Sequence, residues 1–488
     1  MQPFGTDSSS RRDEQAAPEK LPPSDEYQRA IAYLYERINY ERTADTAPYP
    51  FRLQRMTELV NRFDLHGVAG RSIPVVHVAG TKGKGSTSTM VASMLTAGGY
   101  RTGLYTSPHL MRLEERFTVD GKLPNESEVI TMIKSIAAEA DQMAQSSLGA
   151  PTFFEMTTAM ALLHFRNAGC TAAVLEVGLG GKLDSTNVCY PAVTAITSIG
   201  FDHQHILGNT LREIASQKAG IIKAGVPAVS GVVQREARDS IDEIAADKGA
   251  KLFAIGRQFD VQTMSDAGSD DWSTHFDLLS HDLAIGDRKA WTVPLDGDHQ
   301  AANAAVACTI MDLLAASGIV VSESVQKSGL ASTKIAGRVE RFRLRPDVDI
   351  ILDTSHNIDS VASLCQCIRK RRGHRPVTVV FGTSHDKDHR PMLQELCDHC
   401  DSITLTRYHG NPRYREPAEL MRDLPSDVVS KGRLAMVNEN PVSAVRAAID
   451  RILGPHLIVI CGSFFLAAEV RPLLQSMSAP TEFDAGSQ

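Results

Sequence analysis

The sequence predicts an α/β protein built on mostly parallel sheets. From about Ser72 onward, short apolar or β-branched runs alternate with segments of helical period, as in successive βα units. The chain has 488 residues, of which 42% are hydrophobic and 22% charged, so it can form at least two large hydrophobic cores. A single small module and wholesale disorder are both excluded.

The expected elements of the first unit follow one another in order. A buried strand over 73–79 leads through a glycine-rich turn into a helix over 86–97, which Gly98 and Gly99 close. Thr210 and Glu213 have capping-box spacing and predict the start of the helix that carries Lys218. A long helix then begins near residue 300 and ends at a glycine, residue 318. Further strands are expected at 100–105, 172–177, 192–199 and 226–233.

A second α/β series predicts a second domain. Its expected elements are a strand at 349–353, a helix at 359–371, a strand at 376–382, a helix at 390–399 and a strand at 457–461. Between 259 and 295 the alternation weakens, and the polar, acidic stretch 264–272 has the composition of a surface excursion. We therefore expect a disordered leader over 1–25, a first domain over 26–332 and a smaller domain over 337–488.

Charge and cysteine usage limit the partners and the compartment. Lys and Arg number 51 against 58 Asp and Glu, a net charge of -7, so there is no general basic field for nucleic acid. The eight cysteines are scattered, as expected for reduced thiols in a cytoplasm, and the CxxC at 397–400 lacks the second ligand pair of a zinc site. No apolar run approaches the roughly 18 residues of a spanning helix, so no membrane partner is expected.

The segment His77-Val-Ala-Gly-Thr-Lys-Gly-Lys-Gly-Ser-Thr87 is the strongest local signal, since it lies where a strand passes into a helix. Glycines let backbone N–H groups face a phosphate, the helix start adds positive potential, and Lys84 supplies a mobile cation. The spacing departs from GxxxxGK[ST], because Gly85 follows Lys84 and the hydroxyls come later. The segment predicts a phosphate-binding loop, and the alternative is a mobile glycine loop without a ligand.

Three polar residues follow strand ends, where open α/β sheets bind ligands. Ser107, Glu176 and His203 could together hold Mg²⁺ on a nucleotide beside the phosphate-binding loop. Taken singly, each has a structural alternative: a turn hydroxyl, an ion-paired carboxylate and a partly buried histidine. In the second series, Arg338 could reach a phosphate, and Asp353 and His356 could hydrogen-bond a ribose or base. A surface ion pair for Arg338 and a helix cap for Asp353 remain open alternatives.

Together these segments resemble the folylpolyglutamate synthase and dihydrofolate synthase family, ATP-dependent ligases related to the Mur peptide ligases. The resemblance implies a P-loop-type ATPase domain with a mostly parallel sheet and a smaller, Rossmann-like C-terminal α/β domain. The matching segments are GTKGKGST (80–87), LYTSPHL (104–110), TFFEMTT (152–158), EVGLGGKLDSTN (176–187), SIGFDHQHILG (198–208), KAGIIK (218–223), GDHQAANAA (297–305), GRVE (337–340), LDTSHN (352–357), HDKD (385–388) and CGSFFLAAEVR (461–471).

The resemblance also implies roles for matching residues. ATP would be bound by Thr81, Lys82, Gly83, Lys84, Gly85, Ser86, Asn303, Arg338, Asp353 and His356. Mg²⁺, expected as two ions, would be held by Ser107, Glu176, His203 and Lys218, the last as a carbamate. Lys84, Lys218, His203 and Arg338 would be the catalytic residues. The pterin substrate would contact Thr152, Phe153, Phe154, Glu155, Leu183, Asp184 and Ser185, with Phe51 and Leu53 as further candidates. Lys82 departs from the family pattern, which has Asn at this position.

The implied activity is the ATP-dependent joining of L-glutamate to a pterin carboxylate through an acyl phosphate, on dihydropteroate, reduced folate or both. We expect both activities in a monomer. A monofunctional folylpolyglutamate synthase and a Mur-type ligase for a cell-wall precursor are alternatives within the fold. A kinase or nucleotide-dependent switch would explain the phosphate-binding loop alone, and a non-catalytic binding protein would not need the intact set of charged residues.

Overall fold

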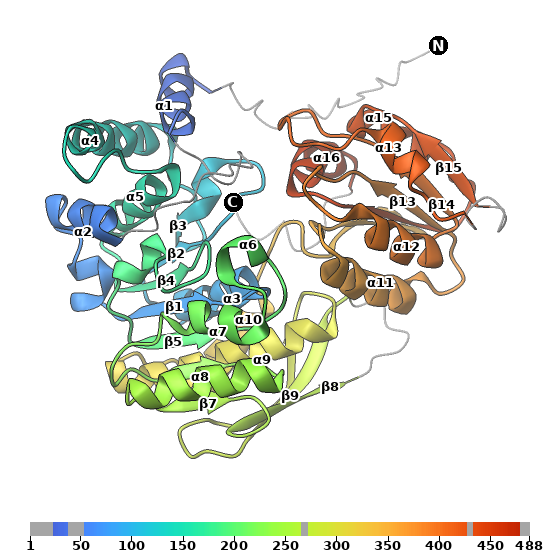
Figure 1. Ribbon diagram of the computed structural model, residues 1–488. Coiled ribbons are helices and arrows are strands. Elements are labelled where there is room, and N and C mark those ends of the chain that lie inside the picture. Colours follow the sequence, from blue (N-terminus) through green and yellow to red (C-terminus); the bar gives the residue numbers. More distant parts are fainter. Residues whose placement is uncertain (1–22, 38–52, 265–271, 427–432, 479–488) are drawn as a thin grey trace, which may run out of the picture.

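The computed structural model describes residues 23–37, 53–264, 272–426 and 433–478. Two α/β units lie side by side, and the chain enters the C-terminal unit through residues 332–339 (Figure 1). The predicted leader up to residue 22, Phe51 and residues 265–271 of the acidic stretch lie outside the described residues.

The N-terminal unit is organised around a seven-stranded sheet in the order β3-β2-β4-β1-β5-β6-β7. Every neighbouring pair is parallel except β2 and β3, which are antiparallel. The strands are β1 (Val75–Ala79), β2 (Thr102–Tyr105), β3 (Phe117–Val119), β4 (Ala172–Glu176), β5 (Val193–Ile196), β6 (Ala228–Ser230) and β7 (Leu252–Ala254). Central strands β1, β4 and β5 are buried along their whole length, because helices cover both faces of the sheet.

The two faces have separate hydrophobic cores. One core joins α3 and α9 to the sheet, and the opposite core joins α2, α4 and α5 to it, while α7 and α8 pack beside β5 and β6. The helices of this unit are α1 (Asp25–Tyr35), α2 (Leu53–Arg62), α3 (Lys84–Ala97), α4 (Glu126–Ala144), α5 (Phe153–Asn167), α6 (Gln204–Leu207), α7 (Leu211–Ala219), α8 (Arg235–Asp247), α9 (Asp298–Leu313) and α10 (Glu323–Ala331). Among the described residues, no helix is both long and apolar enough to cross a membrane.

A small antiparallel sheet occupies the region where the sequence signal weakens. Strands β8 (Phe259–Met264), β9 (Thr274–Ser280) and β10 (Arg288–Val293) pair in the order β10-β9-β8. Phe276, Leu278 and Trp291 belong to the core shared with α9. The stretch 264–272, expected as a surface excursion, connects β8 and β9, and the expectation stays a prediction because residues 265–271 lie outside the described residues. The alternating burial along β9 is typical of a sheet with one covered face.

The C-terminal unit contains a six-stranded sheet in the order β11-β12-β16-β13-β14-β15. Only the β11–β12 pair is antiparallel. Helices α11 and α12 cover one face, and α15 and α16 cover the other. The strands are β11 (Glu340–Arg345), β12 (Val348–Leu352), β13 (Val377–Phe381), β14 (Ser402–Leu405), β15 (Leu434–Val437) and β16 (His456–Cys461). The helices are α11 (Ile358–Arg372), α12 (His389–His399), α13 (Pro417–Arg422), α15 (Pro441–Asp450) and α16 (Phe464–Met477).

The predicted order of elements is confirmed, with shifted bounds. The helix expected from residue 86 begins at Lys84, because Gly83 takes a left-handed conformation at its N-cap (φ 82°). The strand expected over 192–199 is limited to Val193–Ile196. The capping box of Thr210 and Glu213 is present at the start of α7, which carries Lys218 near its end.

Candidate active site

The loop between β1 and α3 is shaped by two glycines. Gly80 has φ 154° and Gly83 has φ 82°. A Cβ atom at Gly80 would lie 2.0 Å from the Thr197 hydroxyl oxygen, and one at Gly83 would lie 2.2 Å from Oδ1 of Asn303. Both positions therefore exclude side chains. Asn303, predicted from α9 as a nucleotide ligand, lies directly against the phosphate-binding loop.

The loop is held in place by the segment that follows β5. The Thr81 and Lys82 amides donate to the carbonyl oxygen and hydroxyl of Ser198, at 2.8 and 2.9 Å, and the Ser198 hydroxyl donates to the Lys82 carbonyl at 3.0 Å. Residues 84–86 form the first turn of α3. First-turn amides have no partner within their own helix, and the helix dipole favours an anion there. The first turn of α3 is therefore the part of the loop whose amides could bind phosphate, as predicted.

Two lysines share one carbonyl oxygen inside this loop. Lys84 Nζ donates to Gly80 O at 3.1 Å, and Lys218 Nζ, from α7, donates to the same oxygen at 3.0 Å. Lys218 is buried, and burial, together with the nearby charge of Lys84, lowers its pKa to about 7. Neither ammonium forms an ion pair with a described side chain within 4.0 Å. Two lysine side chains on one backbone oxygen give this loop a positive potential, which favours the binding of an anion here.

Glu176 provides a buried carboxylate beside these lysines. It ends β4, and its Oε2 accepts a hydrogen bond from the Ser107 amide at 3.1 Å. A Cβ atom at Gly85 would lie 3.5 Å from the same oxygen, so the carboxylate reaches the start of α3. Burial raises its pKa, whereas Lys84 and the Ser107 N–H act in the opposite direction. Carboxylate and hydroxyl oxygens are ligands that Mg²⁺ prefers, so Glu176 and Ser107 fit the ion predicted there.

His203 is more exposed than the other predicted metal ligands. It lies at the N-cap of α6 with φ 48°, and 46% of its side chain is exposed. Its Nε2 is 3.8 Å from a carboxylate oxygen of Asp202. Lys84 and Lys218 are near enough to affect its pKa, which places His203 at the same edge of the sheet.

The C-terminal unit contributes Arg338 and His356 from the opposite side. Arg338 donates to the Thr354 hydroxyl at 2.8 Å, and its guanidinium lies 5.3 Å from the ring centre of Phe464. Arg338 is near enough to Glu176 to oppose the burial that raises the pKa of this carboxyl, so it faces the N-terminal unit. His356 Nδ1 donates to the Thr354 carbonyl at 2.9 Å, which leaves Nε2 as an acceptor, and burial lowers its pKa to about 4.

Asp353 is occupied within its own unit. Its two oxygens accept from the amides of Val339 and Ser355, both at 2.8 Å, and the Ser355 hydroxyl donates a further hydrogen bond. These contacts hold the turn after β12 against the GRVE segment, which carries Arg338. The structure therefore gives Asp353 a positioning role, and direct contact with the nucleotide remains a prediction.

The segment predicted to contact substrate is the start of α5, and most of its polar atoms are used internally. Thr152 and Glu155 form a capping box, and the Glu155 carboxylate is also paired with Arg55 at 3.0 Å, with both side chains buried. Phe153 is 1% exposed and stacks on Tyr35 with the ring centres 5.4 Å apart, so little of its ring is open to the predicted pterin substrate in this arrangement. Phe154 is half-buried and lies against the backbone of Gly178.

Asp184 shapes the neighbouring loop. It accepts hydrogen bonds from the amides of Gly178 and Leu179 and from the amide and hydroxyl of Thr186. Ser185 is buried beside it, whereas Leu183 is 42% exposed. Leu183 and Leu53 line one open groove of about 550 Å³ with Thr57, Asn61 and Leu148, so the structure brings these two candidates together.

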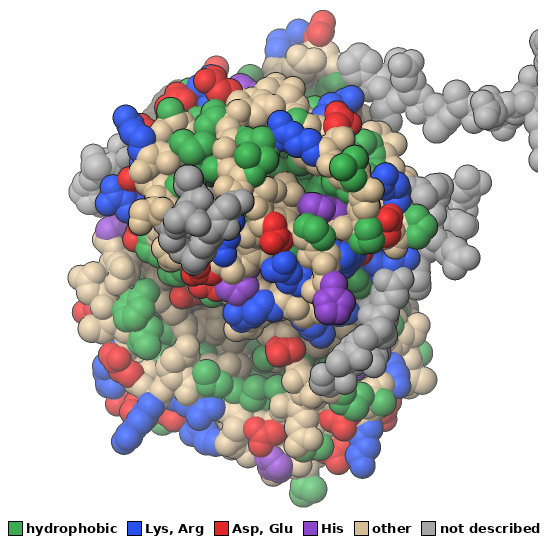
Figure 2. All heavy atoms as spheres, turned by 90° about the vertical axis from the view of Figure 1, so that its right-hand side faces the viewer, with side chains coloured by type: hydrophobic (Ala, Val, Ile, Leu, Met, Phe, Trp, Pro, Cys, Tyr) green, Lys and Arg blue, Asp and Glu red, His purple; other side chains and the backbone are tan. Residues whose placement is uncertain are grey.

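Two charged residues where the two units meet received no role from the sequence. Lys387, in the HDKD segment after β13, is close enough to lower the pKa of both Asp202 and His203. Asp202 itself is half-buried between His203 and Lys387. Both residues follow the ends of strands, one in each of the two sheets, and this position in the sequence could have identified them as site candidates. Charges of both signs are interspersed on the face shown in Figure 2.

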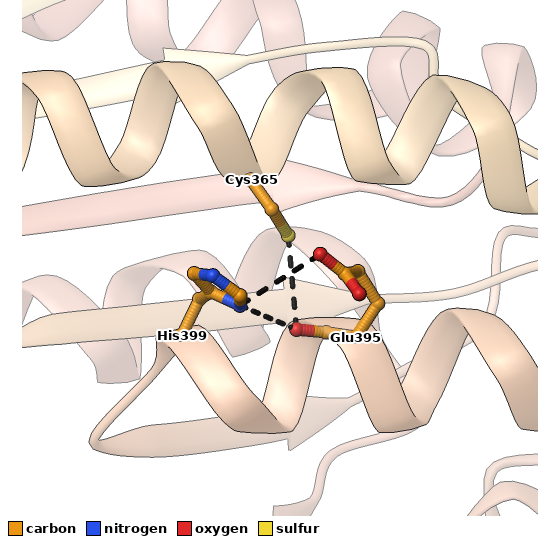
Figure 3. Close-up of side chains that lie close together, drawn as sticks. All are labelled: Cys365, Glu395 and His399. Atoms are coloured by element: carbon orange, nitrogen blue, oxygen red, sulfur yellow. Dashed lines mark hydrogen bonds and ion pairs between the residues drawn. The ribbon is translucent and has the colours of Figure 1, made fainter.

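In the described part of the chain, one further group of side chains has the spacing of a metal site. Cys365 of α11 points toward Glu395 and His399 of α12 (Figure 3). His399 Nδ1 lies 2.9 Å from the Glu395 carbonyl, and its Nε2 accepts from Arg369 at 2.8 Å. A cation on Nδ1 would require N–H at Nε2, which would then face the guanidinium, so this group is not assigned as a metal site.

Comparison with known proteins agrees with this arrangement. Residues 78–311 match the Mur ligase middle domain, and residues 337–464 match the Mur ligase glutamate ligase domain. The "Dihydrofolate synthase/folylpolyglutamate synthase" of Bacillus subtilis is 32% identical over 453 residues, which cover 92% of this chain and 99% of that protein. The chain belongs to the folylpolyglutamate synthase and dihydrofolate synthase family. Its predicted fold class and family are thereby confirmed.

Solved structures of this family have the same fold. Mycobacterium tuberculosis folylpolyglutamate synthase, solved with ADP and AMPPCP, has a TM-score of 0.78 and 29% identity, covering 93% of this chain and 99% of its own. E. coli FolC in complex with DHPP and ADP has a TM-score of 0.76 and 28% identity, covering 92% of this chain and 98% of its own.

Proposed function

We propose that this protein is an ATP-dependent ligase that joins L-glutamate to the carboxylate of a folate-type pterin substrate. The observation that carries the proposal is the pair of ammonium groups on Gly80 O beside the buried carboxylate of Glu176. This arrangement lies at the first turn of α3 and faces Arg338 and His356 of the other unit. It suits the phosphates of ATP, and membership of a ligase family supplies the class of reaction.

The chemistry follows from the charges. A carboxylate is a poor acyl donor, so its oxygen first attacks the γ-phosphorus of ATP. The bond between this phosphorus and the β,γ-bridging oxygen breaks, which gives ADP and an acyl phosphate. Lys84 from the N-terminal unit and Arg338 from the C-terminal unit stabilise negative charge on the transferring phosphoryl group. The glutamate amine then attacks the acyl carbon, the tetrahedral intermediate expels phosphate, and an amide forms. Closure of the two units would exclude water from the acyl phosphate.

Magnesium and a modified Lys218 are part of this proposal. Ser107, Glu176 and His203 would hold Mg²⁺, which supplies charge neutralisation for the phosphates when bound. Lys218 has a pKa of about 7, so a large fraction of its side chain is the neutral amine near pH 7, the form that can react with CO₂. The resulting carbamate would turn a second cation next to Lys84 into an anion able to hold a further metal ion.

The glutamate would bind on the side of the C-terminal unit. Lys387 adds a positive charge near His203 and His356, where an amino acid carboxylate could be held. The groove lined by Leu53 and Leu183 is the proposed wall of the pterin site. We propose both family activities, dihydrofolate synthesis and polyglutamation, in a monomer in the cytoplasm, with a domain boundary between 332 and 337.

The test is ADP release by purified protein with Mg-ATP and L-glutamate, run with dihydropteroate and separately with tetrahydrofolate, with product masses recorded. We expect a mass increase of one glutamate on both substrates and no ADP release above background without glutamate. Turnover with one substrate would assign a single activity. ADP release with neither, or without incorporation of glutamate, contradicts the proposal, and a Mur-type ligase or a kinase would then be tested. D-glutamate in place of the L-isomer is the matched control.

A further inference from the structure

Helix α11 connects the C-terminal unit to the N-terminal unit at both of its ends. Near its last turn, Arg371 donates two hydrogen bonds to the carboxylate of Asp296, at 2.7 and 2.9 Å. Only 6% and 1% of these two side chains are exposed. Asp296 lies two residues before α9, the helix that carries Asn303. This end of α11 is therefore fixed by a buried, bidentate ion pair.

The first turn of α11 lies against the phosphate-binding loop. Lys82 Nζ donates to Oδ1 of Asn357, the N-cap of α11, at 2.9 Å, and lies 3.5 Å from a carboxylate oxygen of Asp359. The exposed fractions are 35% for the Lys82 side chain and 63% for Asp359. A Cβ atom at Gly200 would also lie 4.0 Å from the Asp359 carboxylate. This second contact is a single, partly exposed ion pair.

The two contacts differ in how easily they break. A buried pair cannot be separated without leaving a charge unpaired, whereas an exposed pair changes an equilibrium only a few-fold. The helix has 15 residues and is therefore roughly 22 Å long. A small rotation about the Asp296 end would move the Asp359 end by several times the displacement close to the pivot. The C-terminal end of α11 is therefore fixed to the N-terminal unit, whereas the contact at its N-terminal end can break.

The charges around Lys82 favour such a latch. Asp359 and Asp202 attract its ammonium, Arg338 repels it, and Asn357 accepts its hydrogen bond. Lys82 lies between Thr81 and Gly83, so the position of its backbone is fixed by the loop itself. Its side chain thus couples the backbone of the phosphate-binding loop to the unit that supplies Arg338 and His356.

We propose that Lys82 and Asp359 are positioning residues that latch the C-terminal unit over the phosphate-binding loop, with Asp296–Arg371 as the pivot. This inference rests on the proposed function, because the latch aligns Arg338 with the phosphoryl group in transfer. Among the predicted nucleotide ligands Asp359 pairs only with Lys82, so its effect on turnover passes through that side chain and the position of the unit.

The test is a double-mutant cycle with Lys82→Asn, Asp359→Asn and the double variant. We expect kcat to fall about two- to fivefold in each single variant, as for an exposed ion pair, and the double variant to be no slower than the slower single variant. In Asp359→Asn the KM for ATP should stay within about twofold of wild type, because phosphate binding does not involve Asp359. Asp359→Glu should recover most of the lost kcat.

The matched control is Glu323→Gln, which removes an exposed carboxylate from the first turn of α10. It should leave kcat unchanged, and thermal unfolding of every variant checks the fold. Multiplying effects in the double variant, or a raised KM for ATP in Lys82→Asn with no effect of Asp359→Asn, would overturn the latch. If wild type incorporates no glutamate, the proposed function fails instead, and stabilisation of each variant by Mg-ADP still measures the coupling of the pair.

Discussion

Charged side chains are arranged differently at the phosphate-binding edge of the N-terminal sheet and at the seam along α11, where this helix contacts the N-terminal unit. At the edge, Lys84 and Lys218 donate to one backbone oxygen, and Glu176 accepts from a backbone amide. At the seam, Asp296 and Arg371 neutralise each other through two hydrogen bonds. Unpaired charges lower stability and are useful only when a ligand completes them, whereas a complete pair needs nothing further. We therefore infer a role in ligand binding and catalysis for the first arrangement and a role in stabilising the fold for the second.

The largest expected effect comes from breaking the complete pair. In Asp296→Asn the buried Arg371 guanidinium loses its counter-charge and one of its two hydrogen-bond acceptors. The free energy of unfolding should therefore fall by about 3–5 kcal/mol. Urea denaturation followed by circular dichroism measures this change. Asp239→Asn is the control, because its pair with Arg235 is exposed and should be worth at most about 1 kcal/mol. Equal losses in the two variants would contradict the comparison.

Lys84→Met should lower activity rather than stability, in contrast to Asp296→Asn. Removing the cation from the phosphate-binding loop should lower kcat/KM by about 10²–10³-fold, as for other groups that stabilise a transition state electrostatically. The unfolding temperature of the same variant should change little, because Lys218 loses its like-charged neighbour while the Glu176 carboxylate loses a nearby cation. Steady-state ADP release and thermal unfolding measure the two effects, and Lys122→Met, on an exposed residue, is the control. A variant that loses stability along with activity would show that Lys84 is structural.

The smallest effect concerns a buried polar network close to the site. His77 in β1 is fully buried, contacts the Thr186 hydroxyl at 2.8 Å, and through it Asp184. Burial, with a smaller contribution from Lys223, lowers the pKa of His77 to about 3 from 6.5. His77 is protonated below pH 6.5 in the unfolded chain, whereas in the folded chain it stays neutral down to about pH 3. This histidine therefore makes stability fall as the pH decreases through that window.

The measurement is the urea midpoint of wild type and His77→Gln between pH 7 and 4. The variant should lose less stability on acidification than wild type, although it starts lower because Thr186 loses its partner. His374→Gln, at an exposed position, should run parallel to wild type. Parallel curves for His77→Gln would show that the histidine titrates normally in the folded protein.

Local signals predicted much of the fold, and the failures have physical causes. Strand β1, the glycine turn and α3 are contiguous, so their order could be deduced from the sequence. Strands β8 to β10 depend on pairing across a small sheet, which a weak alternation does not reveal. At the start of α5 a usable signal was overlooked, since Thr152 and Glu155 have the same spacing as Thr210 and Glu213. That spacing identifies Glu155 as a capping residue.

The residues of the candidate site could be proposed from the sequence, but the contacts and electrostatics that join them could not. Glycines, lysines and strand-end polar residues could be found from their neighbours in sequence. The contact of Lys84 and Lys218 with one oxygen joins segments 138 residues apart, and that of Lys82 with Asn357 joins segments 275 residues apart. Such contacts arise from tertiary packing, which also sets the pKa of Lys218.

The burial of the cysteines has a practical consequence for observing the two units in motion. All eight thiols are free and buried, and burial raises the pKa of Cys170, Cys189, Cys308 and Cys365 to about 12, so these thiols stay protonated and react slowly. A cysteine introduced on the surface would react with a maleimide dye far faster than the native ones. The natural chain is thus already a suitable background for attaching one fluorophore to each unit and following their separation during turnover.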